Sequence, residues 1–128
     1  MTSGDEAIVV FTDATSLTCL RVLKPGFRHC FVSLRRPQGW ILIDPLSHKI
    51  DTFILEDVQT DQLLSWCRNH DCTAIRTRVR VDHRQSWVPV APLTCVEVVK
   101  RVLGIQRRRI VTPWQLFCHL REQGAVPS

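Results

Sequence analysis

A predicted helix that begins with a cysteine is the feature that most limits what this chain can fold into. Thr94 and Glu97 stand three positions apart, the spacing of a capping box, so we expect a helix whose first residue is Cys95. Gly104 follows the last apolar residue of the segment and predicts the helix end. At a first turn, free backbone N–H groups and the positive end of the helix dipole stabilise a thiolate. The local sequence therefore predicts a reactive cysteine at the start of a helix.

The overall composition is that of an ordinary globular chain. Of its 128 residues, 45% are hydrophobic and 23% are charged, which suits a single domain spanning residues 1–128. No apolar run is long enough to cross a bilayer, and the apolar stretch 7–11 is too short for the core of a signal peptide. We therefore expect a cytoplasmic protein without a membrane span.

The cysteines do not form a pattern typical of a disulfide framework. They are Cys19, Cys30, Cys67, Cys72, Cys95 and Cys118, and they lie in otherwise apolar segments. In a reducing compartment such cysteines are expected to be free, and a free cysteine usually serves as a small buried hydrophobic residue. Only Cys95 has a local setting that indicates more than packing.

The order of the predicted elements indicates an α+β fold. Apolar alternation and turn residues predict strands at 7–11, 28–34, 40–44, 49–55 and 73–81. The second, third and fourth strands are near enough in sequence to form an antiparallel meander. Helical spacing and caps predict three helices: over 57–70, from Thr94 to Gly104, and from Thr112 to Gly124. The last begins with a second capping box, formed by Thr112 and Gln115, with Pro113 at its favoured first position.

A histidine and an aspartate on neighbouring predicted strands are suitable partners for Cys95. His29 lies near the start of one strand and Asp44 near the end of the next, and an antiparallel pair brings such positions together. The Asp44 carboxylate would hold the imidazole tautomer and favour the imidazolium, which would lower the thiol pKa. Taken singly, each residue has a simpler interpretation: a solvated strand histidine, a turn aspartate before Pro45, or a core cysteine. The three together favour a catalytic group.

This order of elements resembles the circularly permuted branch of the NlpC/P60 papain-like superfamily, in which the histidine strands precede the cysteine helix. The segments that carry the resemblance are 27–32, 40–45, 93–100 and 112–117. The resemblance implies a papain-like fold, with the cysteine helix packed on an antiparallel sheet. It also implies a thiol hydrolase, a peptidase or amidase, that cleaves an amide or ester bond through an acyl-enzyme.

On this interpretation, Cys95 is the nucleophile, His29 acts first as base and then as acid, and Asp44 orients His29. Many relatives carry histidine, asparagine or glutamine as the third member, so His48 is an alternative to Asp44 here. The backbone N–H of Cys95 would contribute to an oxyanion hole. The expected substrate is a peptide or peptidoglycan-like molecule, and no cofactor is expected. The residues expected to line the cleft are Trp40, Trp87 and the loop 82–92.

Three alternatives remain beside the hydrolase. The second hypothesis is a non-catalytic binding or structural module that keeps the fold, as in phage-related proteins, and a place in a phage particle would fit it. Zinc ligand types occur at Cys67, His70, Cys72 and His83, but their spacing matches no common zinc pattern, so we expect no metal. The net charge of +5 and the basic segments 76–80 and 107–109 lack interleaved aromatic residues, so we expect no nucleic-acid partner. The sequence does not indicate the oligomeric state.

Overall fold

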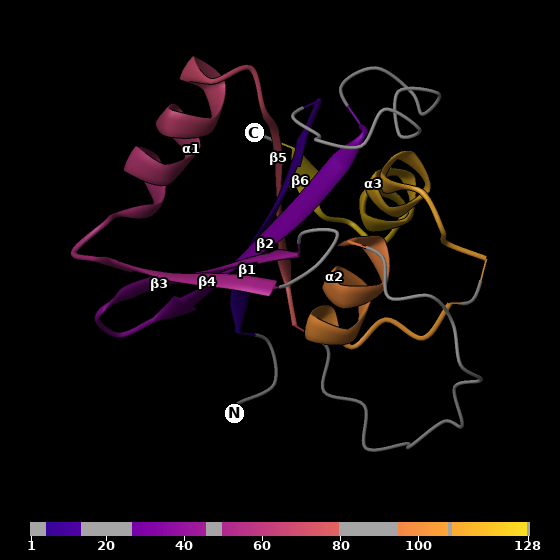
Figure 1. The fold of residues 1–128 in the computed structure, drawn as a ribbon, viewed down its shortest axis with the longest axis horizontal. Coiled ribbons are helices and arrows are strands. Elements are labelled where there is room, and N and C mark those ends of the chain that lie inside the picture. The colour runs from indigo at the N-terminus through magenta and orange to yellow at the C-terminus, as the bar shows by residue number, and fades with distance from the viewer. Residues whose placement is uncertain (1–4, 14–26, 46–49, 80–94, 108, 128) are drawn as a thin grey trace.

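The computed structural model describes residues 5–13, 27–45, 50–79, 95–107 and 109–127 (Figure 1). These residues form an α+β fold with a six-stranded antiparallel sheet and three helices, which confirms the fold class predicted from the sequence. The strands are β1 (Glu6–Thr12), β2 (His29–Arg36), β3 (Gly39–Pro45), β4 (Ile50–Glu56), β5 (Thr73–Arg78) and β6 (Val126–Pro127). The helices are α1 (Thr60–Asn69), α2 (Cys95–Leu103) and α3 (Pro113–Glu122).

The first strand lies inside the sheet, whose strand order is β4-β3-β2-β1-β5-β6. The apolar side chains of residues 7–11 are all 0% exposed, because both faces of β1 are covered. Ala7, Val9 and Phe11 pack into one hydrophobic core, whereas Ile8 and Val10 pack into a second core on the opposite face. Burial on both faces explains why this strand is apolar throughout instead of alternating.

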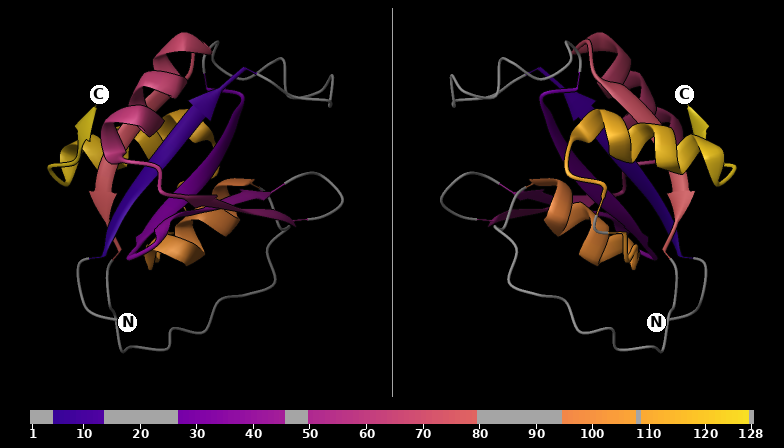
Figure 2. Two further views of the ribbon diagram at one scale, coloured as in Figure 1. Left: turned by 90° about the vertical axis from the view of Figure 1, so that its left-hand side faces the viewer. Right: turned by 90° about the vertical axis from the view of Figure 1, so that its right-hand side faces the viewer.

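The helices cover the two faces of the sheet unequally. Figure 2 shows α1 in front of the sheet in its left-hand view, and α2 and α3 in front of it in its right-hand view. The core under α2 and α3 includes Val99, Leu103 and Leu116, and the core under α1 includes Leu63 and Leu64. The α2–α3 side therefore buries the helix that carries Cys95 against β2.

The strands β2, β3 and β4 form the antiparallel meander predicted from the sequence. Gly39 closes the β2–β3 turn with φ +143°, and a Cβ atom there would lie 2.0 Å from the Leu55 carbonyl oxygen. Only glycine fits this position, because the backbone of β4 passes directly beside it. β4 is an edge strand, and most of its side chains are exposed.

The predicted cap of α3 is confirmed. Thr112 Oγ1 accepts the Gln115 N–H at 3.2 Å, Gln115 Oε1 accepts the Thr112 N–H at 3.1 Å, and Pro113 is the first helical residue. The predicted end of the cysteine helix is confirmed as well: α2 ends at Leu103, and Gly104 has φ +77°. Thr94, and with it the predicted capping box of α2, lies outside the described residues.

Two predicted boundaries need correction. α1 begins at Thr60 rather than near residue 57, because Gln59 and Gln62 form its capping box and Asp57 has φ +58°. β5 ends at Arg78, although Val79 is still buried. Within the described ranges, no helix has both the length and the apolar character needed to cross a membrane.

Candidate active site

His29 and Asp44 lie on adjacent strands and form a hydrogen bond. The β2–β3 register pairs Val32 with Ile43, so its continuation places Asp44 across from Phe31 and diagonal to His29. The His29 and Phe31 ring centroids are 6.4 Å apart. His29 Nε2 donates to Asp44 Oδ1 at 2.8 Å, with side chains that are 13% and 26% exposed. The carboxylate therefore holds the imidazole in one tautomer and one orientation.

Cys95 is far from His29 and Asp44 in the sequence but lies in the same region of the fold. It is the first residue of α2, which packs on β2 through Val96 and Val99 in the core shared with Cys30. The Cys95 side chain is half-buried against this core. The side chains of His29 and Cys30 and the backbone of Cys30 are near enough to Cys95 to act on its pKa. Three segments that are far apart in the sequence therefore meet at the N-terminus of α2.

These neighbours make Cys95 an acidic thiol. The hydrogen bond from the Cys30 side chain has the largest effect on the pKa of Cys95, and the His29 hydrogen bond, the Cys30 backbone and the His29 charge act in the same direction. Burial opposes them, but the net result is a pKa of about 5. At neutral pH, Cys95 is therefore a thiolate, which is the nucleophilic form of the side chain.

The pKa of His29 is raised. Burial alone would lower it, but hydrogen bonds with Cys95 and Asp44, together with the negative charges of both partners, outweigh burial. The shifts of Cys95 and His29 are two aspects of one interaction, because each charge stabilises the other. The two shifts therefore favour the charged forms, the thiolate of Cys95 and the imidazolium of His29, with the Asp44 carboxylate beside the imidazole.

Cys30 belongs to this site, although the sequence analysis treated it as a packing residue. Its side chain is 0% exposed, and burial, followed by the effects of Cys95 and Asp44, raises the pKa of Cys30 well above its ordinary value. Cys30 therefore keeps its proton, and its S–H can donate a hydrogen bond to the Cys95 thiolate. Its position in the sequence could have indicated this role, because Cys30 directly follows His29 in a strand. It faces the side of the sheet on which the cysteine helix packs.

Trp40, which the sequence analysis placed at the cleft, is instead a core residue. It is 1% exposed and packs among the residues under α1, on the face opposite to α2. The interpretation failed because the burial of a tryptophan depends on the helix that covers its strand, and here α1 covers Trp40. His48, Trp87 and the loop 82–92 lie outside the described residues.

The three described members of the zinc alternative make other contacts. Cys67 is buried in the core under α1, and His70 stacks on Trp66 and donates its Nδ1–H to the Trp66 carbonyl oxygen at 2.8 Å. Cys72 lies near the His70 carbonyl oxygen, with a sulfur-to-oxygen distance of 3.5 Å. In the part of the chain that the structure describes, no cluster of three metal-ligating side chains occurs. His83 lies outside that part.

The basic residues considered for nucleic-acid binding are divided between two faces. Arg76 shares the face of Ala74 on the α1 side of β5, and its guanidinium forms an ion pair with Glu6 at 2.8 Å. Arg107 and Arg109 belong to the segment between α2 and α3, on the other side of the sheet. Among the described arginines, the two clusters therefore do not form one continuous basic surface.

The three predicted site residues and Cys30 come from β2, β3 and α2, and they bring together an acidic thiol, an imidazole, a carboxylate and a buried thiol. Comparisons of this chain with protein-family models, with curated protein sequences and with solved structures gave no match.

Proposed function

We propose that this protein is a thiol hydrolase that cleaves an amide or ester bond through an acyl-enzyme on Cys95. One observation carries the proposal: His29 is hydrogen-bonded to the Asp44 carboxylate at 2.8 Å and lies near enough to Cys95 for each to shift the pKa of the other. A solvated strand histidine, a turn aspartate and a core cysteine would not need to converge. A nucleophile, its base and the group that orients the base must do so.

The first half of the reaction uses the thiolate directly. Cys95 Sγ attacks the substrate carbonyl carbon, and the electron pair of the carbonyl bond moves to oxygen. His29 Nε2 is engaged by Asp44, so Nδ1 is the nitrogen that transfers the proton. The imidazolium donates this proton to the leaving amine or alcohol as the carbonyl re-forms, which leaves a thioester on Cys95 and a neutral His29.

The second half returns the enzyme to its starting state. Neutral His29 removes a proton from a water molecule, which attacks the thioester carbonyl. The carbonyl re-forms, the carboxylic acid leaves, and Cys95 is released as a thiolate beside a protonated His29. The N-terminus of α2 supports both steps, because the backbone N–H of Cys95 and the positive end of the helix dipole stabilise negative charge on the carbonyl oxygen.

We further propose that the fold is papain-like and of the permuted NlpC/P60 kind. The support is a cysteine helix packed on an antiparallel sheet, with the histidine strand and the aspartate strand adjacent and earlier in the chain. Cys30 and the acidic thiol at the first residue of α2 fit the same mechanism. The substrate class that follows is a peptide or a peptidoglycan-like molecule.

The proposal is tested by trapping the acyl-enzyme. The wild-type protein is mixed with p-nitrophenyl acetate at pH 6.5, and intact and peptide mass spectrometry measure acetylation of each cysteine during the first turnover. We expect acetylation at Cys95, its loss in Cys95→Ala, and a rate at least tenfold lower in His29→Ala. Cys118→Ala is the matched control, because Cys118 is also a half-buried free cysteine on a helix.

Two results would contradict the proposal. One is equal acetylation of Cys95 and Cys118 in the wild type, which would mean that Cys95 has ordinary reactivity. The other is an unchanged Cys95 rate in His29→Ala when circular dichroism shows that the variant is folded. Either result would favour the non-catalytic binding module.

A further inference from the structure

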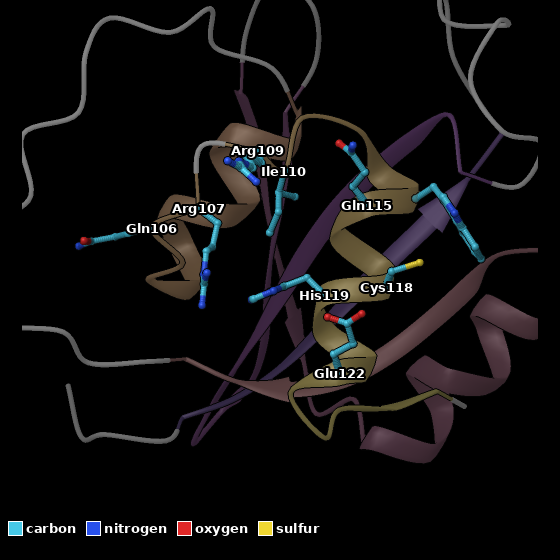
Figure 3. A pocket seen from close by; sticks show the side chains of 9 residues that line it. Gln106, Arg107, Arg109, Ile110, Gln115, Cys118, His119 and Glu122 are labelled. Carbon is cyan, nitrogen blue, oxygen red and sulfur yellow. The ribbon is translucent and has the colours of Figure 1, made fainter.

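The free edge of the sheet at β4 is a surface distinct from the thiol site, and it presents both backbone and apolar groups to solvent. The hollow beside α3 differs from it, because Figure 3 shows the Arg107 and Arg109 side chains there pointing in different directions. The buried Lys100 is engaged within the fold: its Nζ donates to the carbonyl oxygens of Arg107 at 2.7 Å and Ile110 at 2.9 Å. The edge at β4 is therefore the surface whose groups all face one partner.

Large apolar side chains are exposed along β4. Among the described residues, only β3 pairs with this strand, and Ile50, Phe53 and Ile54 are 47%, 50% and 72% exposed. Natural edge strands are usually protected from pairing by lysine, proline or a bulge. β4 contains neither lysine nor proline, and its register with β3 runs without a break from Gly39–Glu56 to Pro45–Ile50. The edge is thus open to a further strand.

The backbone of β4 presents alternate residues to such a strand. The Asp57 N–H donates to the Gln38 carbonyl oxygen at 3.0 Å, which marks a hydrogen-bonded pair in the β3–β4 register. Hydrogen-bonded and non-hydrogen-bonded pairs alternate between antiparallel strands. The odd-numbered residues from 51 to 57 therefore direct their N–H and C=O groups to β3. The even-numbered residues from 50 to 56 direct theirs to the free edge.

A second copy of β4 can pair with this edge in one register that suits its length and charges. Even-numbered residues must face even-numbered residues, so a two-fold axis has to pass through a residue. With the axis at Phe53, all seven residues of the strand pair, and Asp51 lies opposite the partner's Leu55. With the axis at Ile54, Asp51 would lie opposite the partner's Asp57, and like charges in that position repel. With the axis at Thr52, only residues 50–54 would pair.

The register around Phe53 also brings the exposed apolar side chains of two copies together. Phe53 lies opposite the partner's Phe53 in a non-hydrogen-bonded pair, the kind of pair in which side chains are closest. On the other face of the strand, Ile54 lies diagonal to the partner's Ile50, within reach of side-chain contact. The strand therefore complements a second copy of itself in backbone, charge and apolar contact.

We propose that this chain forms a two-fold symmetric dimer in which the β4 strands of two copies pair antiparallel about Phe53. The two sheets then form one continuous sheet across the axis. Phe53 and Ile54 bury their side chains in the interface, and the even-numbered residues of both strands form the hydrogen bonds. The dimer does not depend on the chemistry of Cys95, so this proposal and the thiol hydrolase can fail separately.

Sedimentation equilibrium of the full chain, from micromolar to millimolar concentration, tests the dimer. We expect a reversible monomer–dimer equilibrium. Thr52→Pro should raise the Kd of the dimer about tenfold, because it removes an outward N–H from each copy and leaves the hydrogen bonds with β3 intact. Thr52→Val is its control, because it keeps the N–H and the branched shape, and it should keep the wild-type Kd.

Charge substitutions test the side-chain contacts in the same experiment. Phe53→Lys should raise the Kd about tenfold, because it places two ammonium groups opposite each other at the axis. Val126→Lys is the matched control: Val126 is 61% exposed and lies in β6, at the opposite edge of the sheet. Its Kd should equal that of the wild type.

Disulfide cross-linking tests the register. In Phe53→Cys the two introduced thiols lie opposite each other, at a separation that a disulfide can span. Oxidised glutathione should therefore join two copies through residue 53, as peptide mass spectrometry can show. In Ile54→Cys the two introduced thiols are diagonal and too far apart, so residue 54 should give no cross-link.

The proposal is overturned if the wild type remains a monomer at millimolar concentration, or if Val126→Lys weakens the dimer as much as Phe53→Lys. A cross-link through residue 54 and none through residue 53 would also overturn it, because the register would be wrong. A monomer whose residue 52 and 54 amide NMR signals shift with a blocked peptide of alternating valine and threonine would assign the edge to a peptide partner instead.

Discussion

The buried thiol of Cys30 lies beside Cys95 and is the largest cause of the low pKa of Cys95. Cys30 directly follows His29 in β2, so two consecutive residues of one strand stabilise the same sulfur. The thiolate is therefore stabilised by a neutral donor as well as by the imidazolium. This arrangement predicts that part of the acidity of Cys95 is independent of the protonation of His29.

Replacing Cys30 by alanine should raise the pKa of Cys95 by about one to two units, because a hydrogen bond to a charged group contributes about 1.5–3 kcal/mol. The pKa is read from the pH dependence of Cys95 alkylation by iodoacetamide, followed by peptide mass spectrometry. In the wild type the midpoint should lie near 5.

Two variants control this measurement. Cys30→Ser keeps an O–H donor and should leave the pKa of Cys95 close to the wild-type value. Cys67→Ala removes another buried thiol, from the core under α1, and should have no effect on Cys95. An unchanged midpoint in Cys30→Ala would show that Cys30 does not stabilise the thiolate.

The low pKa of Cys95 predicts how stability depends on pH. Cys95 has a folded-state pKa of about 5, below its unfolded value, so its contribution is complete above the unfolded pKa and is lost as pH falls through 5. The contribution of His29 changes little below its unfolded-state pKa of 6.5, so the change between pH 5 and 6.5 comes mainly from Cys95. Over this range the wild type should therefore gain about 1–2 kcal/mol relative to Cys95→Ala.

Urea denaturation of both proteins at pH 5 and pH 6.5 measures this difference, because the other titrating groups are common to the two chains. The raised pKa of His29 has the opposite sign: its contribution is complete below about 6.5 and is lost as pH rises through the folded-state pKa. The difference in free energy of unfolding between the wild type and Cys95→Ala should therefore stop growing as the pH rises above the folded-state pKa of His29. If this difference in free energy of unfolding were the same at pH 5 and pH 6.5, the low pKa of Cys95 would be contradicted.

Replacing Asp44 by asparagine should lower the pKa of His29, because it removes the charge that lies 2.8 Å from Nε2. The asparagine oxygen can still accept the Nε2–H, so acetylation of Cys95 should fall less in Asp44→Asn than in Asp44→Ala. The His29 pKa is measured by NMR titration of its ring protons. Asp61→Asn, an exposed charge loss on α1, should leave both quantities unchanged.

Replacing Lys100 by methionine should lower the free energy of unfolding by about 2–4 kcal/mol. Methionine fills a similar volume but leaves two carbonyl oxygens and the mostly buried Glu97 without the Lys100 ammonium. Urea denaturation at neutral pH gives the value.

The matched control for this variant is Arg101→Met, which removes a second cation beside Glu97. The Arg101 side chain is 54% exposed, and its Nε lies 3.4 Å from Glu97 Oε1. Surface ion pairs contribute little, so this variant should cost about 0.5 kcal/mol. Equal losses in the two variants would mean that the buried contacts of Lys100 add nothing to stability.

The sequence predicted the elements whose signals are local. The Thr112–Gln115 cap and the Gly104 helix end depend on neighbours within four residues, and the structure confirms both. α1 was placed too early because Gln59 is an uncommon N-cap residue. The position of β1 between β2 and β5 had no local signal, because strand order depends on pairing between distant segments.

The candidate site also has features that the sequence predicts and features that only the tertiary structure decides. The chain by itself determined a cysteine at the start of a helix, and a histidine and an aspartate on adjacent strands, because helix caps and strand pairs are set by short-range contacts. Only the tertiary structure decided that α2 packs on β2, which brings Cys95 to His29 and places Cys30 beneath the thiolate while α1 buries Trp40 on the other face. Those outcomes depend on which apolar faces cover each other, and no single segment contains that information.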